Sequence, residues 1–162
     1  MNKLKTVFVD RDGVINQERS DYVKSIAELE IYPNVAKNIK LLKDAGFLVV
    51  VITNQSAVNR GKITHKILNQ IHNSIQDHLK KYGTFLDGFY YCPHTPDENC
   101  NCRKPKSGLL EKAVLELNID INSSWMIGDN DSDIEAANSI GCKAIKISND
   151  FSLDNAIEEI LN

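Results

Sequence analysis

The sequence predicts an α/β fold, with a doubly wound parallel sheet of about five strands and helices on both faces. Two observations predict it. Short apolar runs alternate along the chain with longer stretches in which apolar residues recur every three or four positions. The runs are apolar at nearly every position, which is typical of strands covered on both faces, and parallel strands need the crossovers that such helices supply.

The elements follow one another in a regular order. The expected strands are residues 6–9, 47–52, 88–91, 125–127 and 144–147. The expected helices carry apolar residues at helical spacing, and turn or capping residues bound several of them. Their apolar positions are Val35, Ile39 and Leu42 before Gly46; Leu68, Ile71, Ile75 and Leu79 after Thr64; Leu110, Ala113, Val114 and Leu117 after Ser107; Ile134, Ala137 and Ile140 before Gly141; and Ala156, Ile157 and Ile160.

Length and charge limit the possible classes of protein. The 162 residues are 25% charged and 42% hydrophobic, an ordinary globular mixture, and we expect one domain, residues 1–162. A core of this size buries roughly 70% of the unfolded surface, so folding needs no disulfide or metal. The apolar runs are far shorter than the ~20 residues of a membrane span, which favours a cytoplasmic protein without a membrane partner. A net charge of −3 argues against nucleic-acid binding. We also expect a monomer.

Chemically reactive residues follow four of the expected strands. In open α/β sheets ligands bind beyond the carboxyl ends of the strands, so a site is expected there. Carboxylates, a hydroxyl group and glycines converge on this edge. The four segments are Asp10-Arg11-Asp12-Gly13, Thr53-Asn54-Gln55-Ser56, Cys92-Pro93-His94 and Gly128-Asp129-Asn130-Asp131-Ser132-Asp133.

The acids at the strand ends predict a cation. Asp10 and Asp129 would repel each other unless a cation lay between them. Magnesium suits this place, because it takes oxygen ligands from carboxylates together with substrate phosphates. Asp12 could then donate and accept a proton while Asp10 acts as nucleophile or ligand. The alternative is that the Asp-Gly pair merely forms a turn.

A hydroxyl group and two cations complete the expected site. Thr53 offers the hydroxyl, and the backbone amides of residues 54–56 can form a nest for an anion. Arg103 and Lys104 precede a helix and could neutralise phosphate oxygens in a transition state. Alternatively, Thr53 belongs to a turn and the cations to a solvated basic surface.

In combination these segments resemble the haloacid dehalogenase-like phosphatases. The pattern of that family is a hydrophobic strand followed by DxDG, then a strand ending in Thr or Ser, then a lysine, then GDxxxD. The resemblance spans residues 6–147 and implies a Rossmann-like fold and the hydrolysis of a small phosphate ester. All four parts occur in order, from Val7 to Gly13, at Ile52 and Thr53, at Lys104, and from Gly128 to Asp133.

The resemblance implies a role for each matching position. Asp10 would be the nucleophile that forms an aspartyl-phosphate, and Asp12 the general acid and then the general base. Thr53 and Lys104 would hold the phosphoryl oxygens. Magnesium would be bound by Asp10, the Asp12 carbonyl and Asp129, with Asp133 outside the ligand shell.

Three of the four cysteines lie near a histidine in residues 92–102, in the pattern C-x-H-x5-C-x-C. Three thiolates and one imidazole make a closed tetrahedral zinc site of the structural type. We therefore expect a zinc-binding loop after the third strand, which orders the chain and directs the following cations to the site. The alternative is a set of unligated thiols, and Cys142 is expected as a buried apolar side chain. The zinc ligands would be Cys92, His94, Cys100 and Cys102.

Many members of the resembled family have a cap domain over the site, but the connections here are too short for one. The site should be open, and short loops should select the substrate. The helix histidines, His65, His72 and His78, are expected on a solvated or half-buried face. The expected specificity residues are Asp21, Tyr22, Asn54, Gln55, Ser56, Arg60 and Arg103.

The capless zinc-loop subgroup that the chain resembles contains D-glycero-D-manno-heptose 1,7-bisphosphate 7-phosphatases and histidinol-phosphate phosphatases. Residues 53–62, TNQSAVNRGK, are similar to TNQSGIARGK of the heptose type, whereas the short loop 94–100 is typical of the histidinol type. Arg60 and Arg103 favour a second phosphate over a cationic tail. We therefore expect a heptose bisphosphate as substrate, with histidinol phosphate as the alternative. A catalytically silent binding module that kept the zinc loop is the alternative of another class.

Overall fold

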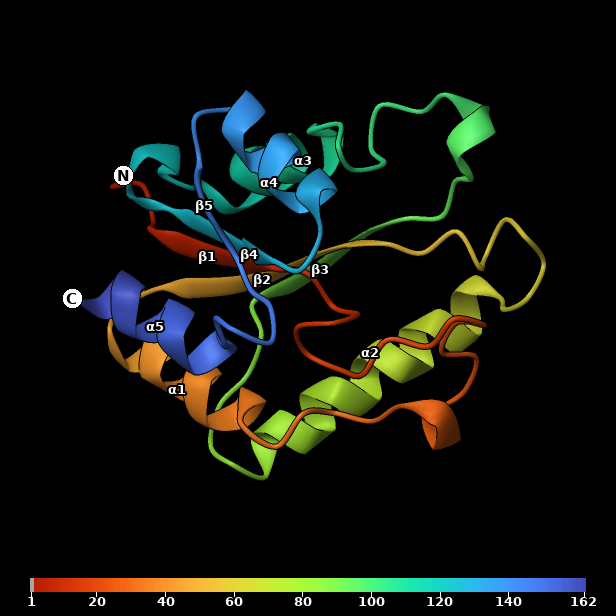
Figure 1. Cartoon of the computed structure of the whole chain (residues 1–162), viewed down its shortest axis with the longest axis horizontal. Coiled ribbons are helices and arrows are strands. Elements are labelled where there is room, and N and C mark those ends of the chain that lie inside the picture. Colours follow the sequence, from red (N-terminus) through yellow and green to blue (C-terminus); the bar gives the residue numbers. More distant parts are fainter. Residues whose placement is uncertain (1) are drawn as a thin grey trace.

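The computed structural model describes residues 2–162, and its strands form a single parallel sheet in the order β3-β2-β1-β4-β5 (Figure 1). All four neighbouring pairs are parallel, so the predicted fold class is confirmed. The second strand lies slightly later than predicted, and the last begins at Lys143 rather than at residue 144. The strands are β1 Thr6–Val9, β2 Leu48–Asn54, β3 Gly88–Cys92, β4 Trp125–Gly128 and β5 Lys143–Lys146.

Helices cover both faces of this sheet. Figure 1 shows α3 and α4 on one side and α1, α2 and α5 on the other. The predicted cap of α2 is present, because the Thr64 side chain accepts a hydrogen bond from the Ile67 amide. The α-helices are α1 Val35–Asp44, α2 His65–Lys80, α3 Gly108–Leu117, α4 Asp131–Ser139 and α5 Leu153–Leu161, and the short 3-10 helices are η1 Ile26–Glu28, η2 Pro96–Glu98 and η3 Ile121–Ser123.

The central strand β1 is buried on both sides. Val7 and Val9 belong to the core formed with α1 and α5, whereas Phe8 belongs to the core formed with α3 and α4. Successive side chains of a strand point to opposite faces, so a strand between two helical layers needs apolar residues at every position. This burial explains the continuous apolar runs of the sequence.

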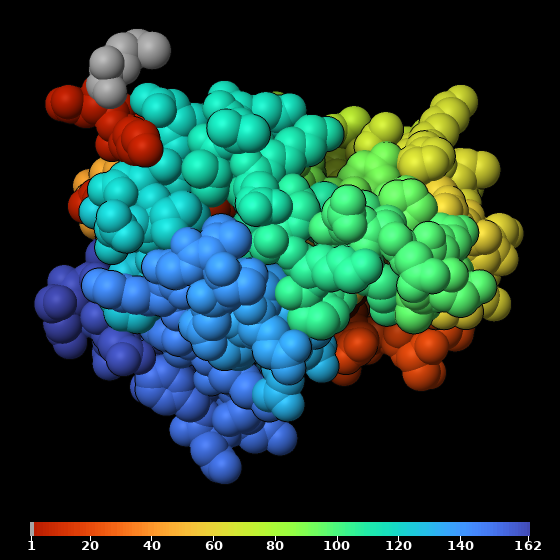
Figure 2. Space-filling model, turned by 90° about the horizontal axis from the view of Figure 1, so that it is seen from above, coloured from red at the N-terminus to blue at the C-terminus, as the bar shows by residue number. Residues whose placement is uncertain are grey.

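Two long connections meet at one end of the molecule. The connection between β3 and α3 lies beside the segment that follows β2, and Figure 2 shows the chain near residue 100 against the chain near residue 60. Asn59 Nδ2 joins them by donating to Glu98 Oε2 at 3.0 Å. None of the helices within residues 2–162 is both long and apolar enough to cross a membrane.

Candidate active site

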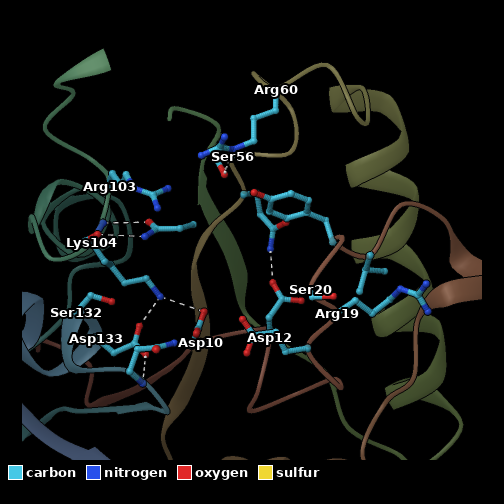
Figure 3. Close-up of a pocket in the computed structure, with 16 residues that line it drawn as sticks. Asp10, Asp12, Arg19, Ser20, Ser56, Arg60, Arg103, Lys104, Ser132 and Asp133 are labelled. Carbon is cyan, nitrogen blue, oxygen red and sulfur yellow. Dashed lines mark hydrogen bonds and ion pairs between the residues drawn. The ribbon is translucent and has the colours of Figure 1, made fainter. Parts of the chain in front are cut away.

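The carboxyl ends of β1, β2 and β4 meet at a pocket of about 420 Å³ (Figure 3). Asp10 follows β1, Asn54 ends β2, and Asn130 follows shortly after β4. The loop at residues 18–23 and the chain after β3 complete the wall. The lining residues are Asp10, Asp12, Glu18, Arg19, Ser20, Tyr22, Val23, Asn54, Gln55, Ser56, Arg60, Arg103, Lys104, Asn130, Ser132 and Asp133.

Lys104 brings a buried cation to this pocket. Its Nζ lies 3.0 Å from Asp10 Oδ1 and 2.5 Å from Asp133 Oδ1, and it donates to the Ile52 carbonyl at 2.8 Å. Burial lowers the pKa of Lys104, but the charges of Asp10 and Asp133 outweigh burial and raise the pKa above its ordinary value. The ammonium group therefore stays charged beside the first aspartate of the motif.

Asp10, Asp129 and Asp133 form a cluster of carboxylates, in which one oxygen from each residue lies within 4.8 Å of the other two. Burial raises the pKa of Asp10 to about 7 against the attraction of Lys104, and the charges of Asp133 and Asp12 add to the rise. Burial and the charge of Asp133 also raise the pKa of Asp129. A divalent cation would relieve this repulsion, and a set of carboxylate oxygens suits a hard ion.

Gly13 allows the loop after β1 to approach these acids. Its φ is +88°, and a Cβ atom at this position would overlap the carboxylate of Asp129. A residue with a side chain would be disfavoured by the backbone conformation and also by this contact. The glycine of the Asp-Arg-Asp-Gly segment is therefore required by the approach to Asp129 as well as by a turn.

Asp12 is held in place by donors on both of its oxygens. Arg11 Nη2 donates to Oδ1 at 2.9 Å and Asn16 Nδ2 at 3.0 Å, while Gln55 Nε2 donates to Oδ2 at 2.8 Å. Burial raises the pKa of Asp12, but the charge of Arg11 and these hydrogen bonds outweigh it and lower the pKa below 3.8. The carboxyl group is thus fixed in the pocket wall that also contains Asp10, where it could exchange a proton with a bound molecule.

Known proteins resemble the chain in sequence. A family model described as HAD-hydrolase-like matches residues 101–159. The D-glycero-beta-D-manno-heptose-1,7-bisphosphate 7-phosphatase of Haemophilus ducreyi is 40% identical over 146 residues, which cover 86% of this chain and 80% of that protein. The protein of the same name from Helicobacter pylori is 42% identical over 137 residues, covering 84% of this chain and 79% of that protein. The chain belongs to the haloacid dehalogenase-like phosphatase family.

A solved member of this phosphatase family has the same fold. It is the D,D-heptose 1,7-bisphosphate phosphatase from B. bronchiseptica, complexed with magnesium and phosphate. The two chains superimpose with a TM-score of 0.90 at 30% sequence identity, and the match covers 98% of each. Membership of the family makes this protein a hydrolase of phosphate esters.

The structure brings most of the predicted site residues of the phosphatase to the pocket. Thr53 is fully buried, and its Oγ1 accepts a hydrogen bond from Gln55 Nε2 at 3.0 Å. Asp21 instead pairs with Arg19 and Lys24 at the surface. The predicted residues that line the pocket are Asp10, Asp12, Tyr22, Asn54, Gln55, Ser56, Arg60, Arg103 and Lys104.

The predicted zinc ligands form a second compact group. Cys92 ends β3 and the other three residues lie in the loop that follows, yet their ligand atoms come within 4.8 Å of one another. Cys92 Sγ lies 3.2 Å from His94 Nδ1 and 3.0 Å from Cys102 Sγ. Sulfur and imidazole ligands in this number can hold a tetrahedral metal ion. Arg103 Nη1 donates to the His94 carbonyl at 3.3 Å, so a hydrogen bond connects the Cys/His cluster to a residue of the pocket wall.

Some residues of the pocket and its support escape the sequence prediction. Glu18, Arg19 and Ser20 line the pocket but belong to a connection without a motif. The expectation that the helix histidines are solvated or half-buried is wrong for His72, which is only 4% exposed. Its position on α2, next to Ile71 in the apolar stripe, is the signal that could have identified it. Cys142 is buried in the core, as predicted.

Proposed function

We propose that this phosphatase removes the 7-phosphate of D-glycero-D-manno-heptose 1,7-bisphosphate. The observation that carries the proposal is the presence of Arg60 and Arg103 in the pocket. Arg60 and Arg103 line the same cavity as Asp10, and in Figure 3 they lie across it from Asp10 and Asp12. One phosphate can therefore lie at Asp10 while cations remain for another. The names of the bacterial relatives support the same substrate.

The proposed reaction has two steps. Asp10 attacks phosphorus as the bond to the leaving oxygen breaks. Asp12, which the second step of the preceding turnover leaves protonated, gives its proton to that oxygen, so the sugar hydroxyl leaves and an aspartyl-phosphate remains. Water then attacks phosphorus, Asp12 takes a proton from it, and the bond between phosphorus and Asp10 breaks to release inorganic phosphate. Lys104, the Thr53 hydroxyl and the backbone amides of residues 54–56 stabilise the phosphoryl oxygens.

Magnesium fits the cluster of carboxylates beside Asp10 in this proposal. Asp10, Asp129 and the Asp12 carbonyl would hold it, while Asp133 pairs with Lys104 and stays outside the ligand shell. When bound, the ion neutralises negative charge on the acids and the phosphate. The assignment is supported by a donor set made of oxygens and by the raised pKa values of Asp10 and Asp129, which the charge of a cation would lower.

We further propose that the group formed by Cys92, His94, Cys100 and Cys102 binds zinc. With four protein ligands no position stays open for substrate, so the ion would be structural. Its contribution would be to order the polar loop that leads into Arg103 and Lys104. The support for this role is the direct continuity between the ligands and the pocket wall.

Release of phosphate in the presence of magnesium tests the activity. Asp10→Asn removes the nucleophile and is expected to lower kcat by roughly 10³-fold or more. Asp131→Asn is the matched control, because this acid is exposed and paired with Lys146 at the surface, and its kcat should not change. Equal activity of wild type and Asp10→Asn, or no activity of wild type on any small phosphate ester, would favour the silent binding module instead.

A comparison of kcat/KM for three substrates tests the specificity. We expect heptose bisphosphate to exceed histidinol phosphate and fructose 1,6-bisphosphate. Arg103→Ala should lower kcat/KM for heptose bisphosphate by roughly 10-fold or more, since charge-assisted hydrogen bonds contribute about 1.5–3 kcal/mol. A preference for histidinol phosphate would refute the proposed substrate and leave the phosphatase chemistry intact.

A monomeric state and a cytoplasmic location stay predictions. Cys92, Cys100, Cys102 and Cys142 form no disulfide with one another, and disulfides are rare in a reducing cytosol. Sedimentation equilibrium tests the oligomeric state, because a monomer has a mass of 18.2 kDa.

A further inference from the structure

Arg11 has the largest of the fully buried side chains in residues 2–162. In sequence it lies between the two aspartates of the motif, Asp10 and Asp12. It is 0% exposed and does not line the pocket, so it cannot contact substrate there. Its guanidinium group instead joins Asp12 and His72, which are 60 positions apart in sequence. Nη2 donates to Asp12 Oδ1 at 2.9 Å, and Nη1 lies 3.2 Å from His72 Nε2.

The contact with Arg11 defines the protonation of His72. A guanidinium group donates hydrogen bonds and accepts none, so Nε2 of His72 must be the acceptor and carries no proton. The ring is therefore neutral, with its proton on Nδ1. Burial and the charge of Arg11 act in the same direction and lower the pKa of His72 to about 3. Charge repulsion between Arg11 and a protonated ring is thus avoided.

Packing fixes the orientation of the imidazole ring. It stacks on Phe89 of β3, with the ring centroids 4.5 Å apart and an interplanar angle of 14°. The Tyr91 ring contacts it edge-on at 6.0 Å. The lone pair of Nε2 therefore points in a fixed direction, which the sheet determines through Phe89.

We infer that His72 is a positioning residue for Asp12, because it orients the Arg11 guanidinium group that holds one carboxyl oxygen of Asp12 in place. The inference rests on the proposed role of Asp12 as the proton donor to the leaving oxygen. His72 provides an acceptor without a negative charge, so Asp12 keeps the carboxylate ion pair of Arg11. A carboxylate in place of His72 would compete with Asp12 for the same cation.

The leaving group of the substrate distinguishes this role from simple packing beneath the site. An alkyl phosphate needs a well-placed proton donor, whereas p-nitrophenolate leaves without protonation. The ratio kcat/KM includes only the steps up to phosphoryl transfer to Asp10, so the later hydrolysis does not obscure the difference. Because general acid catalysis contributes about 10²–10⁴-fold, partial misplacement of Asp12 should cost roughly 10-fold with an alkyl substrate.

Two substitutions of His72 separate the acceptor from the packing. His72→Phe keeps an aromatic ring for the stack on Phe89 but removes the acceptor, and His72→Gln provides an amide oxygen as acceptor but no ring. We expect His72→Phe to lower kcat/KM for heptose bisphosphate by roughly 10-fold and for p-nitrophenyl phosphate by less than about 2-fold. His72→Gln should restore most of the loss. His78→Phe, on the same helix but half-buried and beside Tyr82, is the control and should change neither value.

Equal losses with both substrates, or no advantage of His72→Gln over His72→Phe, would overturn the inference. Arg11→Lys provides a second measurement if His72→Phe does not fold, because lysine keeps the charge but cannot bind both partners as the guanidinium fork does. It should show the same selective loss, and a uniform loss would again count against positioning. A wild-type protein inactive on both substrates would refute the proposed function itself and is a distinct outcome.

Discussion

The side-chain amide of Asn54 pairs with the main chain of Lys104 through both of its polar atoms. Nδ2 donates to the Lys104 carbonyl at 3.1 Å, and Oδ1 accepts from the Lys104 amide at 3.0 Å. This pairing fastens the end of β2 to the residue that follows the Cys/His loop. It fixes the main chain of Lys104 while its ammonium group lies against Asp10 and Asp133.

Replacement of Asn54 by alanine should loosen this attachment. The two hydrogen bonds contribute about 1–3 kcal/mol together, so the free energy of unfolding should fall by that amount. Displacement of Lys104 should lower kcat by roughly 10-fold or more. Asn59→Ala is the control, since Asn59 also contacts the Cys/His loop, through Glu98, but at the exposed surface. Urea unfolding and steady-state kinetics should differ clearly between the two variants, and similar values would contradict the role of Asn54.

Gly13 and Gly83 share a left-handed backbone conformation but differ in their surroundings. Substituting each therefore separates the effect of backbone strain from the effect of a contact with Asp129. Gly13 has φ +88° and Gly83 has φ +74°, but only at Gly13 would a Cβ atom overlap Asp129. Alanine at either position should destabilise the fold by about 1–2 kcal/mol because of the positive φ. Gly13→Ala should in addition weaken magnesium activation by roughly 10–100-fold, as measured by the magnesium concentration that gives half-maximal rate. An unchanged magnesium requirement in Gly13→Ala would show that Asp129 is not needed for the ion.

The buried His72 predicts a specific loss of stability in acid. Its pKa in the folded protein is about 3, below the ordinary value of 6.5, so unfolding takes up a proton between these pH values. The stabilisation is complete above pH 6.5 and is lost as the pH falls towards 3. Each pH unit corresponds to about 1.4 kcal/mol, so wild type should lose about 2 kcal/mol more than His72→Gln between pH 6.5 and pH 5. Parallel pH dependences in urea unfolding would contradict a neutral buried ring.

Replacement of one proposed zinc ligand should lower kcat through the loop before Arg103, although the ligand itself does not line the pocket. Cys100→Ser should release the ion, disorder the loop before Arg103 and lower kcat. Cys142→Ser places a hydroxyl in the core and should cost about 1–3 kcal/mol of stability but leave the zinc content unchanged. Atomic absorption gives the zinc content per chain, and the same preparations give kcat. Full activity of zinc-free Cys100→Ser protein would refute the structural role of the ion.

Much of this fold could be predicted from the sequence because its physical signals are local. The buried strands read as continuous apolar runs, and parallel strands bring their carboxyl ends to one edge whatever the details of packing. For this reason Asp10, Thr53 and Asp129 could be assigned to one site from the sequence alone. The spacing of Cys92, His94, Cys100 and Cys102 likewise suffices for a compact group, since all four lie within eleven residues of chain.

The parts that escaped prediction depend on partners far away in the sequence. Arg11 reads as one residue of a polar turn, and its burial requires an acceptor at His72 on another element. Glu18 and Ser20 reach the pocket only because of the path of the loop after β1. Periodicity reports which face of an element is apolar, but it does not report which polar groups find a partner there.

The sequence by itself determined the order of the elements, the family, and the set of acids and cations at the carboxyl edge. Only the tertiary structure decided how those charges pair. Lys104 lies between Asp10 and Asp133, and Arg11 is directed to Asp12 by the lone pair of His72. The physical reason is that ion pairs and hydrogen bonds depend on distances of a few ångströms between residues that the chain itself leaves far apart.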